Sequence, residues 1–85
     1  MAHSKTAKKR VRQNRERRLR NRHHRSRLRT EVKQLRAAIA AGMTEDVEKR
    51  LPRTCAMLDR MAGRGILHRN AAARTKSRLA RLAAR

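Results

Sequence analysis

Large apolar side chains recur at helical spacing in three stretches of the chain, and no stretch alternates apolar and polar residues as a half-buried strand does. The first stretch predicts a helix from about Ser4 to Ala41, ended by Gly42 in a common helix-stop position. Only its second half carries an apolar stripe, made of Leu28, Val32, Leu35 and Ile39. The first half offers Val11 and Leu19 alone, so we expect it to pack against no partner helix.

The second stretch predicts a helix that starts near Thr44, a suitable N-cap residue. Carboxylates that favour the positive end of the helix dipole follow at Glu45, Asp46 and Glu48. The apolar stripe of this helix consists of Val47, Leu51, Cys55, Leu58 and Ala62. Pro52 interrupts the pattern, so we expect a kink there or a helix that begins later. Gly63 and Gly65 mark its end.

The third stretch predicts a helix that begins between Leu67 and Asn70 and ends near Ala84. Its inward stripe consists of Ala72, Thr75, Leu79 and Leu82. Short connections make neighbouring helices antiparallel, and Ile66 and Leu67 are expected to close the open end of the bundle. The predicted fold class is all-α, a three-helix bundle whose long basic first helix extends beyond it.

Charge divides the chain more sharply than hydropathy does. The net charge is +20: residues 1–30 hold 13 Lys and Arg against one acid, residues 63–85 hold seven and no acid, and residues 31–62 are nearly balanced. We therefore expect a basic N-terminal arm at 1–25, the first half of the first helix, and a bundle at 26–85. The 85 residues include no Phe, Tyr or Trp, so the core must be small and the bundle marginal by itself.

Such an excess of positive charge indicates an anionic partner. Arg outnumbers Lys 20 to 6, which favours nucleic acid because a guanidinium group can form two hydrogen bonds to one phosphate and can stack on a base. The candidate RNA-binding residues of the arm are Lys5, Lys8, Lys9, Arg10, Arg12, Arg15, Arg17, Arg18, Arg20, Arg22, Arg25 and Arg27, with Arg29 next to them. They lie on every side of a helix, as suits a helix enclosed by phosphates. The plain alternative is a solvated tail, and both hold if the arm is disordered when free and helical when bound.

A second basic cluster lies near the other end of the chain. Its candidate RNA-binding residues are His68, Arg69, Asn70, Arg74, Lys76, Ser77 and Arg78, and Arg81 continues the same stripe. Asn70 is equally suited to capping the third helix. Ser77 either donates to a phosphate or faces solvent.

The residues give little support for catalysis, metal binding or a reactive cysteine. The acids are explained by the helix dipole, so no catalytic group stands out, and we predict a protein that is not an enzyme and takes no cofactor or small-molecule substrate. His23 and His24 are neighbours that do not share a helix face, and no metal site is predicted. Cys55 lies on the apolar stripe and is expected to pack in the core.

Two other polyanion-binding classes stay open at this point. One is a nucleoid protein that compacts DNA, which charge alone permits although the chain has no groove-reading helix–turn–helix pattern. The other is a membrane-active cationic helix, which the missing apolar face of the arm disfavours. The chain also has no apolar run long enough to cross a membrane.

Particular runs of residues are similar to a known family. Residues 65–70, Gly-Ile-Leu-His-Arg-Asn, are followed by Ala72, Ala73, Arg74, Lys76, Ser77 and Leu79. Residues 4–10, Ser-Lys-Thr-Ala-Lys-Lys-Arg, the pair Arg29-Thr30 and the turn at 40–42 match as well. Together they resemble the S-twenty family of bacterial small-subunit ribosomal proteins over essentially the whole chain.

The resemblance implies a three-helix bundle with an overlong first helix that acts in the cytoplasm as a scaffold. It implies direct binding to 16S ribosomal RNA within the 30S subunit, in the 5′ domain and against the long penultimate stem, early in assembly. Few or no protein neighbours and no membrane contact are expected. By position, Lys5, Lys8, Lys9 and Arg10 would line RNA at the arm, and the candidate residues from His68 to Ser77 would contact it from the third helix.

Overall fold

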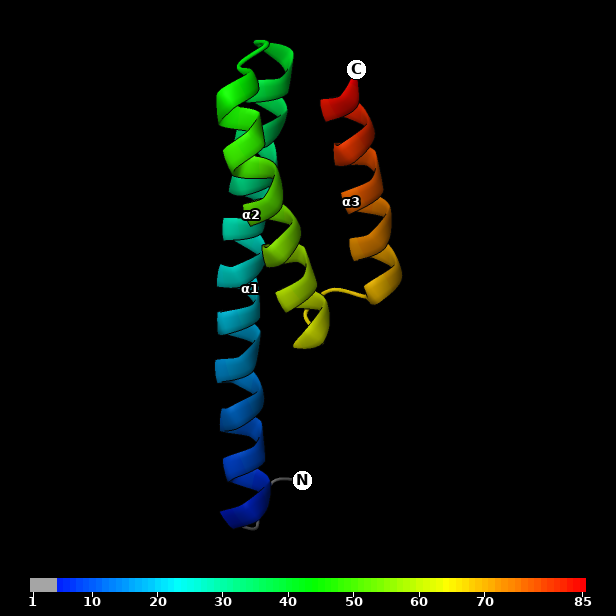
Figure 1. The fold of residues 1–85 in the computed structure, drawn as a ribbon. Helices are drawn as coiled ribbons and strands as arrows, with labels where there is room; N and C mark the ends of the chain where they lie inside the picture. Colours follow the sequence, from blue (N-terminus) through cyan, green and yellow to red (C-terminus); the bar gives the residue numbers. More distant parts are fainter. Residues whose placement is uncertain (1–4) are drawn as a thin grey trace.

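Three helices and no strand make up residues 5–85, the part of the chain that the computed structural model describes. They are α1 (Lys5–Ala40), α2 (Thr44–Gly63) and α3 (Arg69–Ala84). Figure 1 shows α1 and α2 as an antiparallel hairpin, with α3 running back beside α2. The predicted all-α class is therefore confirmed, while the expected first helical residue, Ser4, lies outside the described residues.

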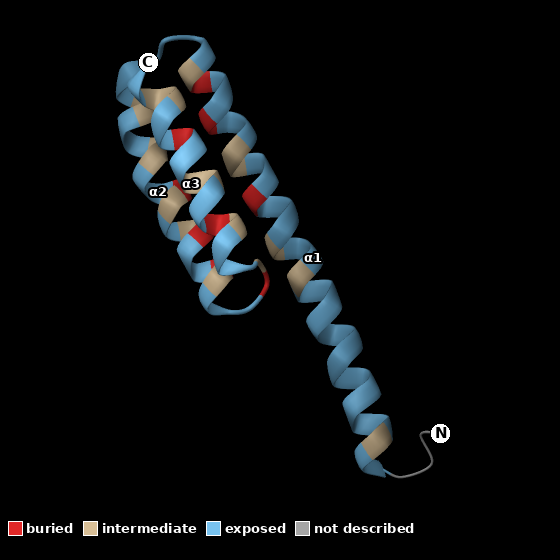
Figure 2. Cartoon of the chain, turned by 90° about the vertical axis from the view of Figure 1, so that its right-hand side faces the viewer, coloured by how far each residue is buried: buried red, intermediate tan, exposed pale blue. Residues whose placement is uncertain are grey.

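The first helix reaches far past the rest of the molecule. Its 36 residues span about 54 Å at 1.5 Å per residue, and the longest dimension of the chain is 58 Å. The half that projects is exposed, with 51% of Val11 and 61% of Leu19 accessible (Figure 2). As predicted, this half packs against no other helix.

Both connections begin with the same glycine-dependent cap. After α1, Gly42 has φ +70° and donates to the carbonyl of Ile39 at 3.1 Å, while Met43 donates to Ala38 at 3.0 Å. After α2, Gly65 has φ +74° and Ile66 donates to Met61 at 3.0 Å. This pair of backbone bonds is the Schellman motif. It requires one residue in the left-handed conformation, which glycine adopts with the least steric strain.

The N-cap of α2 is Met43 and not the predicted Thr44. Met43 already completes the cap of α1, and its carbonyl accepts the first bond of α2, from Val47 at 2.9 Å. The connection is so short that Thr44 is drawn into the first helical turn, and no side chain caps α2. Glu45 lies in that turn, where its carboxylate offsets the missing cap.

Pro52 lies inside α2, which runs without interruption from Thr44 to Gly63. The expectation that the helix begins later was wrong. Pro52 and Glu48 are both exposed, so the Glu48 carbonyl that lacks its usual backbone donor is within reach of water.

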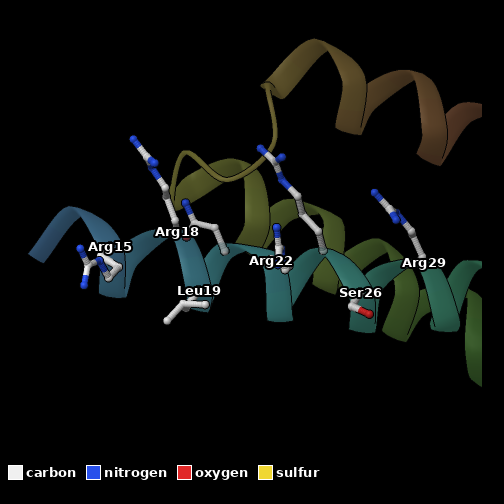
Figure 3. Close-up of a pocket in the computed structure, with 8 residues that line it drawn as sticks. Arg15, Arg18, Leu19, Arg22, Ser26 and Arg29 are labelled. Atoms are coloured by element: carbon white, nitrogen blue, oxygen red, sulfur yellow. The ribbon is translucent and has the colours of Figure 1, made fainter. Parts of the chain in front are cut away.

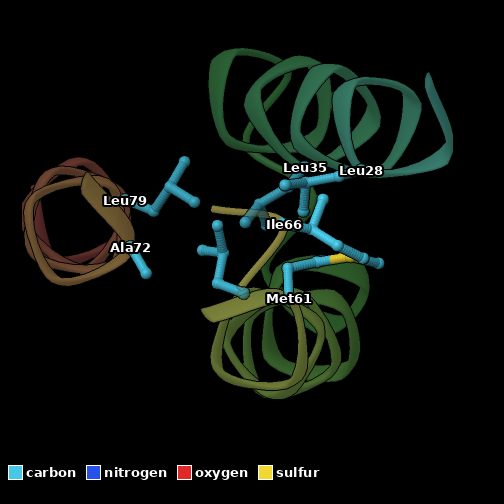
Figure 4. Packing of buried hydrophobic residues seen from close by; sticks show 7 residues of the cluster. Leu28, Leu35, Met61, Ile66, Ala72 and Leu79 are labelled. Atoms are coloured by element: carbon cyan, nitrogen blue, oxygen red, sulfur yellow. The ribbon is translucent and has the colours of Figure 1, made fainter. Parts of the chain in front are cut away.

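The core is one cluster of buried side chains between the three helices (Figure 4): Leu28, Leu35, Leu58, Met61, Ile66, Ala72 and Leu79. Val32 and Ile39 pack against it half-buried, which confirms the predicted stripe of the first helix. Ile66 is buried in the turn after α2 and Leu67 packs beside it, so they close this end of the bundle as predicted.

The second helix presents Thr54 to the core, where the sequence pattern suggested Cys55. Thr54 is 0% exposed, while Cys55 is half-buried. The hydroxyl of Thr54 has no hydrogen-bond partner. The apolar character of cysteine shifted the predicted stripe by one residue, because a helix face is fixed by geometry and not by residue type.

The three helices do not contact one another equally. α2 packs closely against both α1 and α3, while the backbones of α1 and α3 approach each other less and meet through core side chains. The bundle is therefore tighter around α2 than between α1 and α3.

Replacing Leu35 by Ala should destabilise the bundle by about 2–5 kcal/mol, because Leu35 is fully buried and the change leaves a cavity. Thermal unfolding followed by circular dichroism measures the effect. Leu19→Ala is the matched control, since Leu19 is exposed in the projecting half of α1. Equal melting temperatures for the two variants would contradict the core as described.

Replacing Thr54 by Val should stabilise the bundle by about 1 kcal/mol, because it removes a buried hydroxyl without a partner and keeps nearly the same shape. The control is Thr75→Val in α3, where the hydroxyl donates to the Ala71 carbonyl at 2.9 Å. That change loses a hydrogen bond and should not stabilise. Urea unfolding of both variants checks the difference in sign.

Candidate nucleic-acid interface

The projecting half of α1 is basic on every side. All of the arm residues predicted from the sequence are exposed from Lys5 through Arg22, and Glu16 is the single acid among them. A helix without an apolar face cannot lie in a membrane surface, whereas it can accept phosphates from several directions.

Five of these arginines form a regular row. Arg15, Arg18, Arg22, Arg25 and Arg29 follow one another at spacings of three and four and line a shallow hollow along one face of α1. Figure 3 shows this row on α1 below the turn that joins α2 to α3. The charge of the arm was readable from the sequence, and the structure shows that the side chains of this row leave a shallow hollow between them.

Arg25 joins the row to the bundle. Its Nη2 donates to the carbonyl of Ile66 at 2.9 Å. The bond holds the α2–α3 turn against α1 and places the row beside the start of α3. One guanidinium of the predicted arm thus already has a partner within the protein.

Several predicted residues of α3 also have partners within the protein. His68 is the N-cap of α3, with its Nδ1 accepting from the backbone N–H of Asn70 at 3.1 Å, so the cap is His68 and not Asn70. Arg74 donates through Nε to the carbonyl of Asn70 at 3.4 Å. Arg69, Ser77 and Arg78 are exposed without a side-chain bond among the described residues.

Lys76 forms an ion pair with Asp59 of α2, with 2.9 Å between Nζ and Oδ1. The hydrogen bond and the charge of Asp59 raise the pKa of Lys76 above the ordinary lysine value of 10.5. The ammonium is therefore charged throughout neutral pH, and a phosphate that approaches it competes with the Asp59 carboxylate.

A second basic hollow lies between α1 and α2. Arg27 and His24 of α1 face Arg60 and Arg64, with methionine side chains between them. Sequence reasoning missed Arg60 and Arg64 because they flank the apolar stripe of α2. Their spacing of four, on the face turned to α1, was the signal that could have revealed them.

Neither a metal site nor a membrane span is found within residues 5–85. No group of three His, Cys, Asp or Glu side chains there could hold a metal ion, and no helix there is long and apolar enough to span a membrane. The rings of His23 and His24 lie 6.1 Å apart and are tilted by 56°.

Comparison with known proteins identifies the family of the chain. A family model described as Ribosomal protein S20 matches residues 2–84. The chain belongs to this family. The resemblance seen in the runs at 4–10 and 65–70 is thereby confirmed.

Relatives with the name "Small ribosomal subunit protein bS20" match nearly end to end. The protein of Colwellia psychrerythraea is 51% identical over 79 residues, which cover 93% of this chain and 92% of the relative. That of Nitrosomonas eutropha is 48% identical, with 93% and 91% covered, and that of Persephonella marina is 44% identical, with 95% and 88% covered. The family consists of structural proteins of the small ribosomal subunit and is not an enzyme family.

Replacing Asp59 by Asn should lower the pKa of Lys76 toward 10.5, since Asp59 supplies both the hydrogen bond and the charge that raise it. A carbon-13 titration of the lysine Cε signals measures this shift. Because the raised pKa belongs to the folded protein, the ion pair stabilises it below that pKa and is lost as the pH rises through it. An unchanged Lys76 titration would show that the pair does not form in solution.

Proposed function

We propose that this protein binds 16S ribosomal RNA directly and acts as a structural component of the small subunit in the cytoplasm. The RNA contacted is the 5′ domain and the long penultimate stem, and binding supports subunit assembly and translation. The observation that carries the proposal is family membership over nearly the whole chain, joined to a helix that is exposed and basic on all sides. We expect RNA to be its principal neighbour, with few or no protein contacts.

The mechanism follows from the charges. Phosphates of RNA segments that crowd together repel one another, and the arginines and lysines of the arm neutralise them on several sides at once. The bundle fixes the direction of α1, because Arg25 and the core hold the base of the arm. Shape and backbone contacts, more than base edges, supply specificity for folded RNA.

The predicted contact residues differ in how free they are to bind phosphate. Those without a protein partner among the described side chains include the row from Arg15 to Arg22 and, in α3, Arg69 and Arg78. Lys76, held by Asp59, and Arg25, held by Ile66, give up or share an existing bond on binding. We therefore expect the first group to contribute more to RNA affinity than the second, whose existing bonds within the protein must be broken or shared when RNA binds.

We further propose that the chain works in two parts, an arm at 1–25 and a bundle at 26–85. The core residues all lie in the second part, from Leu28 to Leu79. Apart from the bond of Arg25 to Ile66 at its base, helix in the first part has no core contact to stabilise it and is opposed by repulsion among its basic side chains. RNA that neutralises those charges stabilises the arm as a helix.

Competitive equilibrium binding to a 5′-domain 16S RNA fragment tests the function. The competitors are an unrelated structured RNA and duplex DNA of matched charge, at about 0.15 M salt, where nonspecific contacts are weakened. Binding that survives both competitors is expected. Equal displacement by either one would reject a specific ribosomal RNA site, and displacement by DNA alone would favour a DNA-compacting protein.

Deleting residues 2–15 should weaken RNA binding and flatten its dependence on salt. Each phosphate contact contributes roughly 0.7–0.9 to the slope of log affinity against log salt concentration. The change in slope, measured by binding at several salt concentrations, therefore reports how many phosphates the deleted segment touches in the intact complex. An unaltered slope would mean that the start of the arm touches no phosphate.

Amide hydrogen exchange of the free protein should find residues 5–25 unprotected and the bundle protected, with protection of the arm appearing when RNA is added. The physical reason is that the arm has no buried apolar contacts of its own. Leu19 and Leu58 provide amides that are compared directly. Protection throughout the arm without RNA would contradict coupled folding.

A further inference from the structure

A groove between the last turns of α1 and α3 continues the second predicted RNA-binding cluster toward the end of the chain and adds residues of α1 to it. It is open to solvent and has a volume of about 540 Å³. It is lined by four arginines and three apolar residues: Arg36, Arg78, Arg81, Arg85, Ile39, Ala40 and Leu82. We call the four arginines its rim, and Ile39 and Leu82, which are half-buried, its floor. Arg78 was among the predicted contacts and Arg81 was placed on the same basic stripe, while the other five residues were not predicted.

The groove is built by the register of two helices. On α3 and the residue that follows it, positions 78, 81, 82 and 85 share one helix face, and on α1 positions 36, 39 and 40 do the same. α1 thus contributes Arg36 beside Ile39, and α3 with the residue that follows it contributes three arginines beside Leu82. Because α1 and α3 contact each other less than either contacts α2, these two faces are left apart and the apolar floor stays accessible.

No acidic side chain balances the arginines of the groove, although the C-terminal ends of α1 and α3, where helix dipoles favour cations, lie beside them. Among the described residues, none of its lining side chains is acidic, and the side chains of Arg36, Arg81 and Arg85 form no hydrogen bond or ion pair. The nearest acid of the neighbouring hollow is Glu48 of α2. The occupant that complements this groove is anionic at its rim and apolar at its centre.

We propose that the groove binds an unstacked nucleotide of RNA, with its base on Ile39 and Leu82 and the flanking phosphates on the arginine rim. This inference rests on the RNA-binding function proposed above and adds a site to it. A continuous duplex keeps its bases stacked inside and offers phosphate and sugar to the groove, so it leaves the apolar floor without a partner. A bulged or single-stranded nucleotide supplies both parts.

The identity of the cations supports a nucleotide over an acidic peptide. All four are arginine, and although a planar guanidinium binds carboxylate and phosphate alike through two hydrogen bonds, it also stacks on a base, which an acidic peptide does not supply and a lysine ammonium does not do. The groove also lies on the same chain as the strongly basic arm, so RNA held by the arm is concentrated near it.

The test uses the absence of Phe, Tyr and Trp from the chain. No histidine lines the groove, so an upfield ring-current shift of its methyl groups reports a nucleobase. Methyl signals of the full-length protein are recorded with the 5′-domain RNA fragment, with single-stranded oligouridylate and with a blunt RNA duplex. The Leu82 and Ile39 methyls should move upfield with the first two ligands and much less with the duplex, while those of Leu58, which is 1% exposed, stay in place.

Two substitutions distinguish the contribution of the arginine rim to RNA binding from that of the apolar floor. Arg81→Gln should weaken binding of the 5′-domain RNA and lower the salt slope by roughly 0.7–0.9, the value of one phosphate contact. Leu82→Gln should weaken it by about tenfold, as the loss of one base contact does, with the slope unchanged. The charge-matched control is Arg53→Gln, on an exposed position of α2 outside the groove, which should leave the slope and the methyl shifts unchanged.

The outcomes distinguish this inference from the function on which it rests. Specific RNA binding without upfield shifts at Leu82 and Ile39 overturns the nucleotide site alone, and leaves an acidic protein segment as the occupant to seek. Equal shifts with duplex and with oligouridylate also overturn it. Loss of specificity in the competition experiment rejects the proposed function, whatever the methyl signals do.

Discussion

A single small core that all three helices share is the constraint around which this small protein is arranged. The chain has a net charge of +20, and its two basic helices, α1 and α3, meet through core side chains while each packs more extensively on α2. α2 carries four of the six acids and lies between them in its contacts. It also carries four basic residues and is therefore neutral as a whole, so it separates the two basic helices without adding to their charge, and its Asp59 pairs with Lys76 of α3.

The core is small, so each buried side chain contributes a large share of the stability of the bundle. It consists of aliphatic side chains and methionine, and the buried Thr54 has an unsatisfied hydroxyl, as has one buried carboxylate oxygen of Glu31. The two Schellman caps compensate in part, because Gly42 and Gly65 end the helices sharply and keep the connections short. The second cap also places Ile66 in the core, so the same turn reverses the chain and contributes a buried side chain.

The same arrangement explains where binding surface becomes available. Because α1 continues beyond the bundle, its arginines can be enclosed by RNA, while Arg25 anchors the base of the arm on the Ile66 carbonyl. Because α1 and α3 contact each other less than either contacts α2, the opposite end of the bundle leaves apolar side chains accessible between arginines. Both surfaces carry an excess of positive charge, which the proposed binding of phosphate would offset.

The sequence by itself determined the helices, their order, the core stripes of α1 and α3 and the two basic clusters, because helical period and charge are local properties that survive any packing. Family runs such as residues 65–70 were readable for the same reason. The tertiary structure alone decided that Met43 and not Thr44 caps α2, that Thr54 and not Cys55 enters the core, and that His68 caps α3. It also decided which cations are already paired and that Arg36 and Arg81 share one groove, since such contacts depend on how the helices are oriented against one another, which no local pattern records.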